Sequence, residues 1–85
     1  MRQPLTGASQ LGAILVARRR AMKLSQQTLA EKLSISQNRL SEIERDPGAL
    51  TIDRLLELAN LLDLEVSMGE RDRSEKSVKP ASTSW

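Results

Sequence analysis

Five polar residues between positions 36 and 41 carry side chains that can hydrogen-bond to the edges of nucleic-acid bases. They are Ser36, Gln37, Asn38, Arg39 and Ser41. The amides of Gln and Asn donate and accept together, as an adenine edge requires, whereas Arg suits a guanine or a phosphate. The alternative for each residue is an exposed polar side chain that contacts no base. Which of the two applies depends on the elements that hold these residues.

Residues for catalysis or metal binding are scarce in the sequence. The chain has no His and no Cys, which removes the commonest metal ligands and two frequent catalytic groups. It also lacks a glycine-rich phosphate loop and a pair of carboxylates in an evident pocket. We therefore expect a binding protein and not an enzyme, with no catalytic residue, metal or cofactor. A small enzyme or enzyme subunit and a purely protein-binding adaptor are the alternatives from other classes.

The pattern around the polar residues predicts two short helices joined by a tight turn. Ser25 can cap a first helix over Gln26–Leu33, and Ser36 can cap a second over Gln37–Glu44. Their inward-facing apolar residues are Leu29, Ala30, Leu33, Leu40 and Ile43. This is the layout of a helix-turn-helix, whose second helix enters the DNA major groove by its N-terminal end.

Positive charge is concentrated in the part of the chain that holds this motif. Residues 1–50 contain eight Lys or Arg and four Asp or Glu, whereas residues 51–85 contain five and seven. Phosphate binding needs such a basic surface, although a solvated basic face would give the same counts. At the start of the first motif helix, Gln26 and Gln27 are expected to contact DNA phosphates.

The composition favours a single small all-α domain. The chain has 85 residues, of which 39% are hydrophobic, and its one aromatic residue is Trp85. A core of Leu, Ile, Val, Ala and Met favours packed helices, and so small a core gains from dimerisation. Without cysteine or an apolar run of membrane length, we expect a cytoplasmic protein with no membrane contact. DNA binding would associate it with the nucleoid.

Two further helices are expected to flank the motif. Residues 1–8 are interpreted as a flexible N-terminal arm, and Ser9 can cap a helix over about Gln10–Met22. After a turn, Thr51 can cap a final helix. The buried stripe of this final helix is expected to contain Ile52, Leu55, Leu56, Ala59 and Leu62. The apolar residues left over, which are expected to form a dimer face, are Leu58 and Leu61.

The spacing of apolar residues along the chain changes after the final helix. Apolar and polar residues alternate over Leu64, Glu65, Val66, Ser67 and Met68, which predicts a half-buried β-strand. A lone strand needs a partner, so we expect it to pair with the same strand of a second copy. Residues 9–69 would then form the DNA-binding and dimerisation domain. Residues 70–85 are charged and rich in Ser, which predicts a disordered tail, and Trp85 at its end is either an anchor for a partner or incidental.

The segment LSQQTLAEKLSISQNRLSEIE resembles the helix-turn-helix of the phage-repressor-like (XRE) family. The matching residues are Gln26, Leu29, Ala30, Leu40 and Glu44. The resemblance implies a compact, lambda-repressor-like domain of four or five helices. It also implies a partly buried, bidentate ion pair between Arg19 and Glu44. Ser34 departs from the pattern, because the family often has Gly there in a left-handed conformation.

From Ser9 onward, the chain resembles HipB-type antitoxins. The motif at Ser25–Glu44 and the sequence LDLEVSM match firmly, and the tail ending in Trp85 matches more weakly. The resemblance implies a homodimer with an intermolecular β-lid that represses its own operon at palindromic double-stranded operators. It also implies binding and neutralisation of a HipA-like Ser/Thr kinase toxin, which Trp85 can contact. A stand-alone phage-type repressor with no toxin partner is the alternative.

Overall fold

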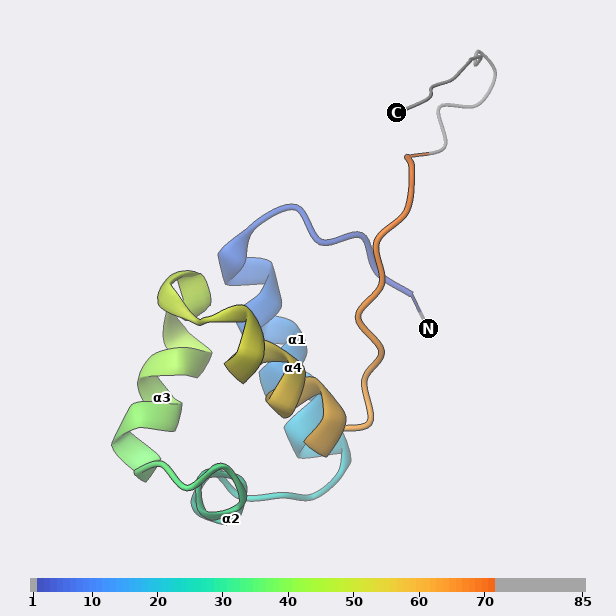
Figure 1. The fold of residues 1–85 in the computed structure, drawn as a ribbon. Coiled ribbons are helices and arrows are strands. Elements are labelled where there is room, and N and C mark those ends of the chain that lie inside the picture. The colour runs from blue at the N-terminus through green and yellow to red at the C-terminus, as the bar shows by residue number, and fades with distance from the viewer. Residues whose placement is uncertain (1, 72–85) are drawn as a thin grey trace.

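The computed structural model describes residues 2–71 (Figure 1). This part of the chain contains four α-helices and one short 3₁₀ helix. They are α1 (Ala8–Ala21), α2 (Gln26–Leu33), α3 (Gln37–Arg45), η1 (Pro47–Ala49) and α4 (Ile52–Leu61). Helix α3 packs against α1, α2 and η1, and α4 packs against α2. The described part is therefore helical, as predicted. None of its helices has the length and apolar character needed to cross a membrane.

Three helices begin at the side-chain caps predicted from the sequence. Ser25 Oγ accepts the backbone N–H of Thr28, and Ser36 Oγ accepts that of Arg39. At the start of α4, the Thr51 hydroxyl oxygen accepts the N–H of Arg54 at 3.1 Å. Each bond satisfies a backbone donor that the first turn of a helix leaves without an intrahelical partner.

The predicted cap of the first helix is wrong. Helix α1 begins at Ala8, and its N-cap is Gly7, which makes no side-chain cap bond. Ser9 lies inside the helix. The chain before it is instead held by Gln10, whose side-chain oxygen accepts from the backbone and the hydroxyl of Thr6 at 2.9 and 3.0 Å. A hydrogen bond from within the helix has replaced the expected serine cap.

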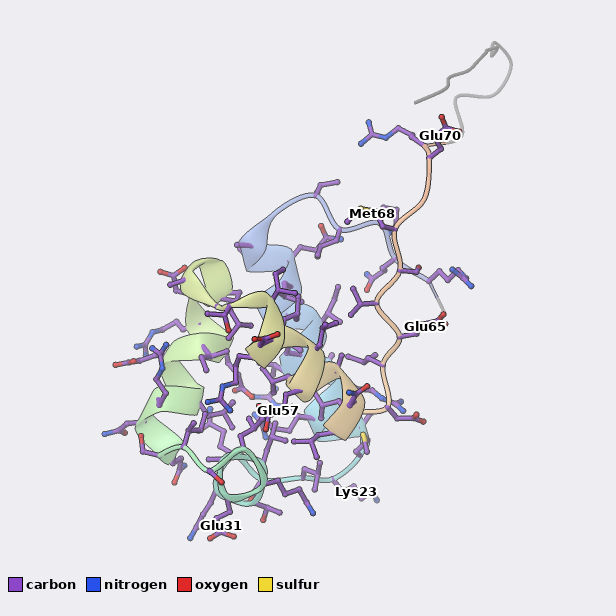
Figure 2. All side chains as sticks on the ribbon, viewed as in Figure 1. Lys23, Glu31, Glu57, Glu65, Met68 and Glu70 are labelled. Carbon is purple, nitrogen blue, oxygen red and sulfur yellow. The ribbon has the colours of Figure 1, made fainter. Side chains whose placement is uncertain are left out.

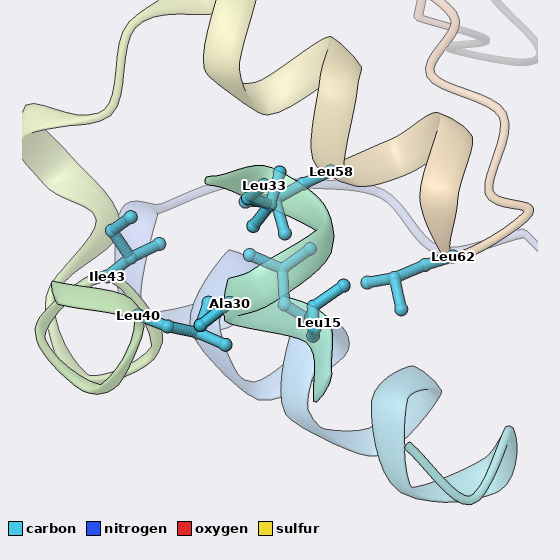
Figure 3. Packing of buried hydrophobic residues seen from close by; sticks show 8 residues of the cluster. Leu15, Ala30, Leu33, Leu40, Ile43, Leu58 and Leu62 are labelled. Carbon is cyan, nitrogen blue, oxygen red and sulfur yellow. The ribbon is translucent and has the colours of Figure 1, made fainter. Parts of the chain in front are cut away.

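Leucines from all four helices meet in one core (Figure 3). The most deeply buried are Leu15, Leu29, Leu33, Leu40, Leu58 and Leu62. Burying each such side chain stabilises the fold by about 1.5–3 kcal/mol. The apolar faces predicted for α2 and α3 are the ones that the core uses.

Helix α1 approaches the end of α3 closely at Gly12. A Cβ atom at this position would lie 2.5 Å from the backbone oxygen of Glu44 and 3.4 Å from Cδ of Pro47. Real Cβ atoms essentially never come so near a backbone oxygen. Gly12 therefore lets two backbones come together where any other residue would hold them apart.

The turn between α2 and α3 forms with Ser34 in the left-handed conformation, at φ 59° and ψ 41°. The backbone N–H of Ser34 donates to the carbonyl of Glu31, and that of Ile35 donates to Ala30. These two bonds satisfy carbonyls that the end of α2 leaves open. The turn thus keeps the geometry that glycine favours, at the cost of some backbone strain in a serine.

Helix α4 turns a different face inward from the one predicted. Leu58 is 1% exposed and belongs to the core, whereas Ile52 is 68% exposed and Leu56 43% exposed. Leu55 and Leu61 are half-buried, and Ala59 and Leu62 are buried as expected. The predicted buried stripe was wrong because α4 has apolar residues on most of its circumference. The spacing of the apolar residues alone therefore did not determine which side of α4 faces the core.

The residues after α4 run as an extended segment away from the core (Figure 1). Leu64 is half-buried and its N–H donates to the carbonyl of Ala59 at 2.8 Å. Residues Leu64–Met68 do not form the predicted strand, and residues 2–71 contain no β-strand. Trp85 and the predicted tail beyond residue 71 lie outside the described residues.

Candidate nucleic-acid interface

The predicted base-reading residues gather on the first turn of α3. Ser36, Gln37, Asn38 and Arg39 are all exposed there, and Ser41 is half-buried one turn further on. On the opposite face, Leu40 and Ile43 enter the core. The same helix therefore fixes its orientation with one face and presents amides, a hydroxyl and a guanidinium to solvent with the other.

Arg39 is held loosely in the free protein. Its guanidinium lies 3.2 Å from the carboxylate of Glu42, and both side chains are more than half exposed. An exposed pair of this kind contributes at most about 1 kcal/mol. Arg39 can therefore exchange Glu42 for a phosphate or a base edge at little cost.

A buried ion pair ties α1 to α3. Arg19 Nε donates to Glu44 Oε2 at 2.7 Å, and Arg19 Nη2 donates to Glu44 Oε1 at 3.3 Å. The two side chains are only 10% and 7% exposed. Arg19 Nη1 also donates to the carbonyl of Leu24, so the guanidinium spans α1, the α1–α2 turn and α3. The bidentate pair expected between these two residues is present in the structure.

Gln26 extends this network to the exposed surface. Its Nε2 donates to Glu44 Oε1 at 2.8 Å, and its Oε1 accepts from Gln37 Nε2 at 3.4 Å. The side chain is thus directed toward α3. A contact with a phosphate would instead require it to point toward solvent. Gln27, beside it, is exposed. The expected phosphate role of Gln26 is left to its backbone N–H at the start of α2.

Arg54 is a residue of this surface that the sequence did not point to. Its Nη1 donates to the carbonyl of Leu33 at the end of α2 and to Glu57 Oε1, at 3.1 and 2.8 Å. It shares with Arg39 a shallow hollow of about 210 Å³. The other residues that line the hollow are Ile35, Ile43, Ala49, Leu50 and Thr51. The one available signal was an Arg three residues after a cap, which does not reveal that the start of α4 and α3 line the same hollow.

The predicted lid residues lie apart from this surface. Glu65 and Met68 lie on the extended C-terminal segment (Figure 2), whereas α3 lies on the other side of the helical domain (Figure 1). Val66 and Met68 are exposed, at 52% and 99%. The structure therefore brings together the residues expected to face DNA, and keeps those expected to join two copies elsewhere.

The arrangement has a counterpart in a known family. A model of the Helix-turn-helix family matches residues 15–68, which is more than half of the chain and includes the whole of α2, α3 and α4. Among curated proteins, none matches the sequence. The matched segment holds the capped turn, the buried Arg19–Glu44 pair and the exposed first turn of α3. The chain belongs to the XRE-type helix-turn-helix family of DNA-binding transcriptional regulators.

Proposed function

We propose that this protein is a dimeric, sequence-specific repressor and antitoxin of the HipB kind. It would bind a palindromic operator in its own promoter and also bind and neutralise a HipA-like Ser/Thr kinase toxin. The observation that carries the DNA-binding part is the exposed polar first turn of α3 on a helix locked to the core through Leu40 and Glu44. Fixed donors and acceptors are what base readout needs, because discrimination between bases depends on geometry.

The roles of individual residues follow from their positions. Gln37 and Asn38 are proposed to read base edges, with Ser36, Arg39 and Ser41 at the borders of the same contact. Gln27 and the backbone at the start of α2 are proposed to contact phosphates. Arg54 joins this group, because it lines the same hollow as Arg39.

Exposed apolar residues in the last third of the described chain support a homodimer. Ile52 and Leu56 lie on the outer side of α4, and Val66 and Met68 lie on the extended segment. Alternation over Leu64–Met68 suits a strand whose backbone groups pair with those of a second copy. Two recognition helices about 34 Å apart would then meet successive major grooves, which demands a palindrome.

Replacing Gln37 by Ala tests the DNA-binding part of the proposal. We expect a loss of about tenfold or more in affinity for the selected operator, since a good bidentate base contact is worth about 1–3 kcal/mol. Affinity for unrelated duplex DNA should change little. Asn60→Ala, at an exposed position on α4, is the matched control and should leave both affinities unchanged. Equal losses on both DNAs would remove Gln37 as a reader.

The toxin-binding part rests on the resemblance of the chain to HipB-type antitoxins. A pull-down from the native lysate should retain a kinase of the HipA type with the full-length protein. The same experiment with Trp85→Ala asks whether this residue, outside the described part of the chain, anchors the partner. Retention of DNA binding with no kinase in either sample would favour the alternative, a stand-alone phage-type repressor.

A further inference from the structure

Arg18 interrupts the apolar face of α1. It lies three and four residues after Leu15 and Ile14, where helical spacing would place another apolar residue. Its Nε donates to the backbone carbonyl of Leu62 at 2.7 Å, and its side chain is 36% exposed. Leu62 is the C-cap of α4, so Arg18 joins the last turn of α1 to the end of α4, which lies beside it in Figure 1.

The chain leaves α4 through a turn with a defined geometry. Asp63 adopts the left-handed conformation, at φ 56°. Its N–H donates to the carbonyl of Asn60 at 3.3 Å, and the N–H of Leu64 donates to that of Ala59 at 2.8 Å. These two bonds close the end of a helix and determine the direction in which the chain continues. In Figure 1 the chain reverses its direction at this point and continues as the extended segment.

The hydrogen bond from Arg18 holds this turn against α1. The carbonyl of Leu62 belongs to the end of α4, where carbonyls have no partner within the helix. A guanidinium is always charged, and its bond to a carbonyl at the negative end of a helix is stronger than a bond between neutral groups. The carboxylate of Asp63 adds little, since it lies 3.7 Å from Arg18 Nη2 and its side chain is 90% exposed. The backbone bond, and not the ion pair, therefore fixes the turn.

Helix α1 also holds α3, through the residue next to Arg18. Arg19 donates two hydrogen bonds to Glu44 of α3. Two consecutive residues of α1 are thus bonded to α3 and to the turn at which the extended segment begins. The direction of the segment relative to α3 is therefore set within one chain.

This direction matters in the proposed dimer. The extended segments of two copies would pair there, so the angle at which each segment leaves α4 sets the distance and rotation between the two α3 helices. A fixed angle gives one arrangement, which suits one spacing between the half-sites of a palindrome. A segment that hinges at Asp63 gives several arrangements, and the dimer would then bind several spacings.

We infer that Arg18 is a positioning residue that fixes the half-site spacing of the operator. It acts through the backbone carbonyl of Leu62 and contacts no DNA in this role. The inference rests on the proposed function, in which the segment after α4 joins two copies. It assigns a part in operator selection to a residue that lies outside the two helices of the helix-turn-helix.

The experiment compares full-length variants on duplexes that differ in the spacing of two half-sites. The half-site is taken from a duplex that the wild-type protein selects from a random library, and inverted pairs of it are separated by spacers that change in steps of two base pairs. Each step rotates one half-site by about 70° and moves it by about 7 Å. A duplex with one half-site measures the contact of a single domain. Sedimentation first establishes a protein concentration at which each variant is a dimer.

The spacing ratio, which is the affinity for the best spacing divided by that for the next step, is the quantity compared. We expect a ratio of about tenfold or more for the wild-type protein, because a rigid dimer loses its second contact when the spacing is wrong. Arg18→Met removes the donor and should reduce the ratio to about threefold or less. Arg18→Lys returns a charged donor and should restore most of it. A role in stability alone would leave the ratio unchanged.

Three further variants test the separate parts of this mechanism. Arg20→Met removes the same charge from an exposed position in the same turn of α1, so it should keep the spacing ratio and match Arg18→Met on the single half-site. Asp63→Asn removes the carboxylate but tolerates the left-handed conformation, so it should also keep the ratio. Asp63→Val disfavours that conformation and should lose the ratio with Arg18 intact. Circular dichroism establishes that each variant is folded, and Asp63→Val carries the test if Arg18→Met is not.

The possible outcomes separate the inference from the proposed function. An unchanged spacing ratio in Arg18→Met, or in Asp63→Val where that variant carries the test, overturns the inference and leaves the dimeric repressor standing. A loss in Arg20→Met as large as that in Arg18→Met also overturns it, because the missing charge alone would then explain the effect. A wild-type protein that binds one half-site as tightly as any pair overturns the proposed dimer together with the inference.

Discussion

The contact between α1 and α3 buries its polar groups and pairs them, whereas the outer side of α4 and the segment after it expose apolar groups. In the first region, here called the α1–α3 seam, Gly12 touches the end of α3 and Arg19 holds Glu44. In the second, here called the C-terminal apolar residues, the exposed side chains are Ile52, Leu56, Val66 and Met68. Buried polar groups are tolerated only when they are bonded, whereas exposed apolar side chains remain available for contact with a partner.

The difference indicates which region the monomer needs and which the proposed dimer would use. The α1–α3 seam is complete within one chain, since its charges and hydrogen bonds are matched there. The C-terminal apolar residues gain less from the monomer, because much of each side chain stays exposed to water. Substitutions in the seam should therefore act on folding, and substitutions among the C-terminal apolar residues should act on self-association.

The largest effect is expected from Arg19→Met. It leaves the carboxylate of Glu44 buried without its cation, and breaking a buried pair in this way costs about 3–5 kcal/mol. Urea unfolding followed by circular dichroism measures the loss. Arg20→Met, at an exposed position in the same turn of α1, is the matched control and should change the free energy of unfolding by about 0.5 kcal/mol or less. Similar values for the two variants would show that the pair contributes no more than a surface contact.

A smaller loss is expected from Gly12→Ala. Inside a helix this change normally stabilises by about 0.5–1 kcal/mol. Here the new Cβ would lie 2.5 Å from a backbone oxygen that cannot rotate away, so α1 and α3 must separate. We expect a net destabilisation of about 1–3 kcal/mol in the same unfolding experiment.

The reverse substitution on the exposed side of α1 supplies the contrast for Gly12. Ala13→Gly should destabilise by about 0.5–1 kcal/mol, in line with ordinary helix propensity. Position 12, in the seam, should then be more stable with glycine, and position 13, outside it, should be more stable with alanine. A more stable Gly12→Ala variant would mean that the helices do not approach as closely as the structure has them.

The turn between α2 and α3 contains a residue whose backbone conformation lowers the stability of the fold. Ser34 has φ 59°, a conformation that costs a residue with a side chain about 1–2 kcal/mol. Ser34→Gly should remove this strain and, after the larger entropy loss of glycine, stabilise by about 0.5–1 kcal/mol. Ser34→Ala retains the Cβ and should bring no such gain. A gain in both variants would trace the effect to the lost hydroxyl and not to the backbone.

The sequence predicted the parts of this fold that depend on local rules. The caps at Ser25, Ser36 and Thr51 need only a hydroxyl before an apolar-periodic run, and all three are present. The apolar faces of α2 and α3 were also correct, because each of these helices has one clear apolar side.

The features that escaped prediction depend on how distant elements meet. Gly12 reads as an unremarkable residue inside a helix until the end of α3 is placed against it. The rotation of α4 and the presence of Arg54 and Arg39 in one hollow likewise follow from packing between helices. The connection from Glu44 through Gln26 to Gln37 joins residues 18 and 11 positions apart, which no local pattern relates.

The smallest effect on stability, and the clearest effect on assembly, is expected from Val66→Asp. Val66 is 52% exposed, so the monomer should lose about 0.5 kcal/mol or less. If the segment pairs with a second copy, the charge would be buried in the dimer, and sedimentation at low micromolar concentration should show a shift toward monomer. Ser67→Asp, its neighbour on the opposite side of an extended chain, is the matched control and should leave the mass unchanged. A dimer of equal strength in both variants would move the interface away from this segment and toward Ile52 and Leu56, the exposed apolar residues of α4.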